Sequence, residues 1–232
     1  MNAFTSWERL LLSGVAGAVD GIGYVLLHVF TAHITGNTVH LGTDAGRLDL
    51  ASAWKPALAI AAFVAGVAAG ALTRESCTRR GIPPRPVVAS VTGLLLVVFL
   101  AVGLAGPRTA VVRFVALAVP AAMAMGCMNA VMPVVGGRRV KTYITGTMTE
   151  FAEAAVAAVI ASARERARFA RRAAGQLGLW STYLAGGAVS GFTGARWGVV
   201  AALLPIGGVA AVVCVEAWRM RGGAAMESRN VT

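Results

Sequence analysis

Ile34-Thr35-Gly36-Asn37 ends a long apolar run that carries a single acid, Asp20, near its middle. About 110 residues later, Ile144-Thr145-Gly146-Thr147 ends another apolar run, in which Asn129 takes the place of Asp20. The chain is therefore predicted to contain two copies of one unit. Lipid cannot hydrogen-bond the backbone groups that a broken helix releases, so such a break must face protein or water. We expect a helix break, and a candidate site, at each motif.

The composition is that of an integral membrane protein. The 232 residues are 57% hydrophobic and 13% charged, with a mean hydropathy of +0.70, which is too apolar for one soluble core of this size. The net charge of +11 does not indicate nucleic acid, because the basic residues lie between apolar segments without interleaved aromatic residues. Attraction to anionic lipid at the inner leaflet explains them better.

Six stretches are long and apolar enough for a spanning helix, which needs roughly 20 residues. We therefore expect an all-α protein that forms one membrane domain over residues 1–232. The six predicted spans are Leu10–Ala32, Trp54–Leu72, Val87–Ala105, Val111–Val135, Gln176–Ala195 and Val199–Ala217.

Positive charge predicts the orientation, because Lys and Arg are retained on the cytoplasmic side. With the N-terminus inside, 16 of the 21 basic residues lie on the cytoplasmic side. Both termini are then cytoplasmic, and residues 164–175 form a basic cytoplasmic segment. Residues 219–232 are expected to form a disordered tail.

The two units are predicted to cover approximately residues 7–105 and 108–218. Three spans per unit is an odd number, so the second copy enters the membrane from the opposite side and gives a 3+3 inverted repeat, as in many secondary transporters. The alternative is that small residues recur by chance in a chain with 28 glycines. The further matching pairs are Gly17 with Gly126, Gly66 with Gly187 and Gly70 with Gly191.

Two motifs carry a family resemblance. Residues 16–23, AGAVDGIG, are followed by residues 35–42, TGNTVHLG, and later by Asn129-Ala130 and Thr145-Gly146-Thr147. This combination resembles the YoaK-type family of six-span bacterial membrane proteins, a domain of unknown function. The resemblance implies a bacterial inner-membrane protein and carries no activity that could be transferred.

Asp20 is the strongest site candidate. A carboxylate near the bilayer centre costs at least ~2.5–3.5 kcal/mol on insertion scales and persists mainly beside a cavity, a partner or an ion. One hypothesis is proton or cation coupling through Asp20. The other is a structural role, in which a neutral Asp20 bonds Asn129 or the broken backbone.

The remaining candidates for substrate or ion binding come from the two motifs, whose side-chain oxygens adjoin backbone carbonyls, although helix capping alone would also explain them. These candidates are Thr35, Gly36, Asn37, Thr145, Gly146 and Thr147. Secondary candidates are His40 with Asp44, as a pair near the outer surface, and Glu150 with Glu153, which share a helix face.

No metal, cofactor or enzymatic site is predicted. His28, His33 and His40 are spaced by five and seven residues, which does not place three ligands on one helix face. The three cysteines show no pairing pattern, and no nucleophile or nucleotide-binding motif is present in the sequence.

Two classes of function remain. A small-molecule or ion transporter would use alternating access around Asp20 and Asn129, and would pair into a homodimer through small residues such as Gly66 and Gly70 or Gly187 and Gly191. A non-transporting scaffold or sensor would instead use the basic segment to bind a partner or anionic lipid. The substrate is not predicted by the sequence.

Overall fold

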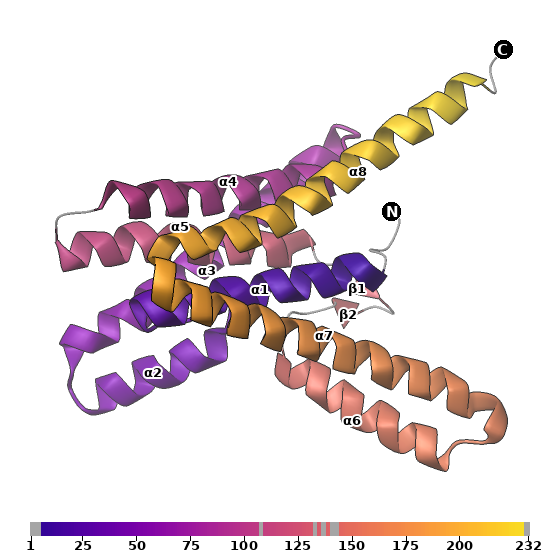
Figure 1. Ribbon diagram of the computed structural model, residues 1–232, viewed down its shortest axis with the longest axis horizontal. Helices are drawn as coiled ribbons and strands as arrows, with labels where there is room; N and C mark the ends of the chain where they lie inside the picture. Colours follow the sequence, from indigo (N-terminus) through magenta and orange to yellow (C-terminus); the bar gives the residue numbers. More distant parts are fainter. Residues whose placement is uncertain (1–5, 107–108, 132–133, 136–137, 140–143, 230–232) are drawn as a thin grey trace.

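The computed structural model describes residues 6–106, 109–131, 134–135, 138–139 and 144–229. Their regular structure is helical, apart from one antiparallel pair of two-residue strands, β1 (Val134–Val135) and β2 (Arg138–Arg139). The helices, shown in Figure 1, are α1 (Ser6–Leu27), α2 (Ile34–Gly46), α3 (Leu50–Arg79), α4 (Pro84–Ala105), α5 (Ala110–Val131), α6 (Ile144–Ile160), α7 (Ala163–Trp197), the short η1 (Gly198–Ala202) and α8 (Leu203–Arg229).

Five helical stretches of the described part are long and apolar enough to cross a membrane. Four of them lie in α1, α3, α4 and α5, and the fifth, Ala163–Arg221, comprises α7, η1 and most of α8. The last two predicted spans both fall within this fifth stretch. The chain is therefore a helical, multi-pass membrane protein.

The first predicted span was wrong at its end. Instead of continuing to Ala32, α1 stops at Leu27, and His28 adopts a positive φ of 56° that a continuing helix does not allow. The break covers residues 28–33, so Ile34-Thr35-Gly36-Asn37 forms the first turn of α2 rather than the break itself. In the second unit Ile144 likewise begins α6, and residues 140–143 lie outside the described part.

The core lies where α1, α4, α5 and α8 meet. Contacts join α1 to α5 and α8, and α4 to the same two helices. Because these helices are apolar on several faces, their aliphatic side chains fill the centre, including Leu12, Ile22, Leu96, Leu117 and Met125. Two further helices pack on this bundle: α7 lies along α1, and α3 lies along α5 and adds Ala59, Ala62 and Phe63 to the core.

Two helical hairpins extend to opposite ends of the molecule (Figure 1). One is α2 with the start of α3, and the other is α6 with the start of α7. The predicted basic segment, residues 164–175, forms the first turns of α7. The segment predicted as a disordered tail from residue 219 begins as helix, because α8 continues to Arg229.

Candidate functional site

Asp20 is buried, with 4% of its surface exposed, and it binds the segment that follows its own helix. Its Oδ1 accepts hydrogen bonds from the backbone N–H of Thr31 (2.7 Å) and of Ala32 (2.6 Å), and from the Thr31 hydroxyl (2.9 Å). Its Oδ2 accepts a 2.5 Å hydrogen bond from the hydroxyl of Tyr183 in α7. Asp20 therefore satisfies backbone donors that the helix break has released.

These bonds fix the path of the break. Asp20 lies seven residues before Leu27, the last residue of α1, which is about 10 Å along a helix at 1.5 Å per residue. The backbone of Thr31 and Ala32 must fold back by this distance to reach the carboxylate. The segment 28–33 is thus a short re-entrant turn held against the middle of α1.

Asn37 fixes the other end of the same turn. It is fully buried, its Nδ2 donates to the Phe30 carbonyl (2.6 Å), and its Oδ1 accepts from the Phe30 N–H (2.9 Å). The side-chain amide of Asn37 thus satisfies both backbone groups of Phe30, and these two bonds join the first turn of α2 to the break. Its neighbour Thr35 is exposed, and Gly36 lies against the rings of Phe30 and His33.

Asn129 was the residue expected to match Asp20. In the described part it donates to the carbonyl of Met125 in its own helix (3.0 Å). Thr147 is buried, and Thr145 and Gly146 are exposed at the start of α6. Residues 140–143, where the equivalent turn would lie, are outside the described part.

The secondary candidates lie outside these turns. The exposed His40 contacts the Phe30 ring at a centroid distance of 6.3 Å, and Asp44 is half-buried in the same helix. In the other hairpin, Glu150 accepts from Gln176 (2.8 Å) and lies 3.5 Å from Arg172, while Glu153 is exposed. Glu150 therefore helps to join α6 to α7.

Tyr183 is a site residue that sequence reasoning missed. It is one of three tyrosines, and it lies in the least hydrophobic predicted span. The signal that could have found it is Gly17, three residues before Asp20. A methyl group at Gly17 would collide with the backbone of Tyr183, so this glycine lets α7 approach closely enough for the hydroxyl to reach the carboxylate.

Glycines also bring α3 and α5 together. A methyl group at Gly126 would collide with the Phe63 carbonyl, and one at Gly66 would collide with that of Met123. In the same way, a methyl group at Gly186 would collide with the Gly14 carbonyl in α1. Gly186, rather than the expected Gly187, makes the closest approach to α1. Gly66 and Gly70 are used inside the chain, which removes them from the expected dimer contact.

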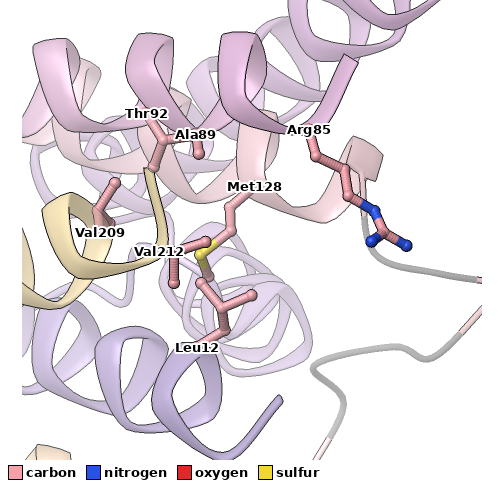
Figure 2. A pocket seen from close by; sticks show the side chains of 7 residues that line it. All are labelled: Leu12, Arg85, Ala89, Thr92, Met128, Val209 and Val212. Atoms are coloured by element: carbon pink, nitrogen blue, oxygen red, sulfur yellow. The ribbon is translucent and has the colours of Figure 1, made fainter. Parts of the chain in front are cut away.

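Two small cavities are lined by residues of the core. The first, of about 20 Å³, is shown in Figure 2, where the guanidinium group of Arg85 points away from the apolar side chains. The second is of about 10 Å³. Each has room for about one water molecule. The first is lined by Leu12, Arg85, Ala89, Thr92, Met128, Val209 and Val212, and the second by Val19, Ile22, Leu96, Phe99, Ala121, Ala202 and Pro205.

One known protein family matches most of this chain. The model of the family described as "Protein of unknown function (DUF1275)" matches residues 9–215, which is most of the chain. This chain belongs to the DUF1275 family. A UPF0700 transmembrane protein, YoaK of Bacillus subtilis (strain 168), is 45% identical over 58 residues, which cover 25% of this chain and 26% of that protein. No solved structure matches the chain.

One end of the core of this DUF1275 protein carries a cluster of charged residues. Glu8 of α1 is fully buried and forms an ion pair with Arg219 of α8 at 2.6 Å. Arg219 also forms an ion pair with Glu216 at 3.1 Å. Arg85, at the edge of the first cavity, lies 3.9 Å from Glu216. These four residues join α1, α4 and α8 beyond the first cavity.

Proposed function

We propose that this DUF1275 protein is a small secondary transporter or permease of the bacterial inner membrane, built as an inverted repeat of three spans plus three. The observation that carries the proposal is the correspondence between the two cavities in the core. Each has room for only about one water molecule, so this structure would correspond to an occluded state of an alternating-access cycle.

Six spans are favoured by the geometry of the last apolar stretch. As one helix its 59 residues would be about 90 Å long at 1.5 Å per residue, three times the ~30 Å of bilayer hydrocarbon. Gly198 interrupts it with a φ of 58°, and α8 then runs back beside α1 and α4 (Figure 1). We therefore count α7 and α8 as separate spans.

The duplication is supported by contacts that repeat at constant spacing. Gly17 approaches Tyr183 as Gly126 approaches Phe63, which relates α1 to α5 by 109 positions and α3 to α7 by 120. The approach of Gly186 to Gly14 and of Gly66 to Met123 follows the same two spacings. In Figure 1, α1 and α5 run in opposite directions, as two oppositely inserted copies must.

The cavity linings follow these spacings independently. Leu12 and Met128 of the first cavity correspond to Ala121 and Val19 of the second, 109 positions away. Residues of α4 and α8 correspond at 113 positions, and the pairs are Ala89 with Ala202, Thr92 with Pro205, Leu96 with Val209, and Phe99 with Val212. A path along the core axis would thus offer equivalent half-sites to the two sides of the membrane.

The two ends of this path differ in charge. The positions equivalent to the charged cluster carry no charge, and they are Leu117 for Glu8, Gly198 for Arg85, Gly103 for Glu216 and Gly106 for Arg219. In the proposed orientation the charged end is cytoplasmic. Opening toward the cytoplasm would then require the ion pairs to separate, whereas opening outward would require only apolar contacts to part.

Cysteine accessibility tests the proposal. Leu12→Cys and Ala121→Cys, made singly in a cysteine-free chain, probe equivalent positions of the two cavities. Alternating access requires a membrane-impermeant thiol reagent to modify Leu12→Cys from the cytoplasmic side and Ala121→Cys from the outside. If both remain unmodified in proteoliposomes, while a cysteine at the exposed position 47 reacts, the core is permanently dry and the transporter proposal fails.

In this proposal Asp20 either couples transport to protons or has a structural role. Its hydrogen bonds to the re-entrant turn favour the structural role in the occluded state. Proton coupling would require the Tyr183 bond to break when a pathway opens, which would expose the carboxylate to water. A homodimer remains part of the proposal, through surfaces other than Gly66 and Gly70.

A second candidate is a scaffold or sensor. It is favoured by the hairpin of α6 and α7, which extends from the body and exposes arginines of residues 164–172 (Figure 1). The arginines of this hairpin would bind anionic lipid or a partner protein at the inner leaflet. Deletion of the hairpin charges separates the two candidates, because a scaffold loses its function while transport through the core persists.

A further inference from the structure

We propose that the groove between α1, α7 and α8 binds one acyl chain of an inner-leaflet phospholipid. The groove has a volume of about 380 Å³ and is open along one side. This volume is within the range of small-molecule sites, about 300–1,000 Å³. Its lining is almost entirely apolar, and consists of Leu10, Leu11, Gly14, Val15, Ala18, Thr182, Ala185, Gly186, Val189, Leu204, Pro205 and Gly208.

The dimensions of the groove fit half of a bilayer. Its α1 wall runs from Leu10 to Ala18, which is eight residue steps and so about 12 Å of helix. One leaflet contributes about 15 Å of hydrocarbon. This wall belongs to the first half of α1, the cytoplasmic half in the proposed orientation. An acyl chain entering from the inner leaflet would therefore lie along the groove.

The equivalent positions of α4 and α5 carry larger side chains. At the spacings set by the glycine contacts and cavities, Met123 corresponds to Gly14 and Leu95 corresponds to Gly208. Met123 and Leu95 both pack against the core. The groove thus has two glycines where the equivalent region of α4 and α5 has two large side chains, which leaves space for apolar atoms that the chain does not supply.

A second copy of the chain is the competing occupant, and the length of the groove argues against it. A packing helix would contact α1 along more than eight residues and would need a matching ridge. Within the groove α8 lies close to α1, because a Cβ at Gly208 would lie 2.5 Å from Val15 Cγ2. A flexible chain of methylenes adapts to such an uneven surface.

Photo-crosslinking in nanodiscs tests the site. The probe is a phosphatidylglycerol with a diazirine in one acyl chain, and adducts are mapped by peptide mass spectrometry. We expect adducts at Ala185 and Val189 to exceed those at Leu94 and Val97, which are exposed on α4. Phosphatidylcholine with the same chain should label equally, because the groove contacts the chain and not the headgroup.

A larger side chain inside the groove should exclude the acyl chain, which gives a second test. Gly14→Met copies the residue of the other unit, and its Cβ would lie 3.4 Å from the Thr182 carbonyl, an ordinary contact. If Met displaces two methylenes, labelling of the groove falls about tenfold while labelling of α4 is unchanged. Gly191→Met is the matched control, because nothing lies within 4 Å of a Cβ there. Ala185→Leu is the second variant if Gly14→Met does not fold.

Three outcomes would overturn the proposal. These are equal labelling of the groove and of α4, unchanged groove labelling in both filling variants, or an Ala185→Cys disulfide between two copies of the chain. A free diazirine fatty acid that displaces the phospholipid probe at equal concentration would likewise exclude phospholipid as the occupant.

Discussion

The hydroxyl of Tyr183 donates a 2.5 Å hydrogen bond to Oδ2 of Asp20, although the two residues are 163 positions apart. At the spacings of the two units, Asn129 and Phe63 occupy the corresponding positions. The acid and the phenol therefore occur together at the α1–α7 crossing, and neither occurs at the corresponding α5–α3 crossing. This joint difference indicates that the hydroxyl is present because the carboxylate is.

Tyr183→Phe should retain the fold, because Phe63 shows that a phenyl ring fits beside the crossing glycine. Loss of the bond leaves one oxygen of a buried carboxylate without its partner, so unfolding free energy should fall by about 1–3 kcal/mol. Tyr24→Phe, at an exposed tyrosine, is the control and should be nearly silent. Reversible unfolding in mixed micelles measures both. Equal stability of the two variants would contradict a structural role for the bond.

Asp20→Asn should be milder than Asp20→Leu. The Asn oxygen can still accept from Thr31 and Ala32, whereas Leu leaves these buried donors unsatisfied at about 1–3 kcal/mol each. In a double-mutant cycle, Tyr183→Phe should cost less in the Asp20→Asn background than alone. The carboxyl infrared band separates the two hypotheses for Asp20. A band that does not titrate between about pH 4 and 9, and that Asp20→Asn removes, would argue against proton coupling.

Asn37→Ala should release the re-entrant turn. Both backbone groups of Phe30 lose their partner, and we expect a loss of about 1–3 kcal/mol for each group that stays buried. Hydrogen exchange at residues 29–32 should increase. The exposed Thr35→Ala serves as control and should leave exchange unchanged. Equal protection in the two variants would show that Asp20 alone holds the turn.

Arg219→Gln should be strongly destabilising, because it leaves the fully buried Glu8 without its 2.6 Å partner. Removing one member of a buried ion pair typically costs about 3–5 kcal/mol. The control is Arg79→Gln, whose partner Glu75 is exposed and whose loss should cost about 0–1 kcal/mol. Chemical unfolding of both variants in the same detergent compares them. A small effect at Arg219 would indicate that water reaches Glu8.

The proposed orientation predicts the sidedness of labelling. Single cysteines at positions 79 and 168 should be protected from an impermeant reagent in intact cells, whereas a cysteine at position 47 should react. The reason is that cytoplasmic placement of both termini puts 16 of the 21 basic residues inside. The opposite labelling pattern would reverse the orientation.

Much of the fold follows from local sequence. Apolar length predicted the membrane class, and the predicted spans fall largely within the five apolar helical stretches, because a spanning helix satisfies its backbone within itself. The end of α1 was misplaced by five residues, since Val29 to Ala32 are mostly apolar and nothing local shows that Asp20 will capture their N–H groups. The break therefore comes before the motif.

The site was predicted less completely. Asp20 and Asn37 stood out as polar residues within or beside an apolar run. Tyr183 and Arg219 did not, because their roles depend on partners 163 and 211 positions away. In the same way, only the α1–α7 contact shows that Gly186, rather than Gly187, makes the closest approach.

The packing of α1 on α7 determines when Asp20 gains its partners during synthesis. Because α1 packs on α7 and α5 packs on α3, neither half of the chain contains the partners of its own first helix. At about 5–20 residues per second, the ribosome needs roughly 10–30 s to make the 163 residues that separate Asp20 from Tyr183. During that time Thr31 and Ala32, only 11 and 12 residues away, are the partners available to the nascent acid. The turn thus provides hydrogen-bond donors to the Asp20 carboxylate in the membrane before the last third of the protein, which contains Tyr183, has been synthesised.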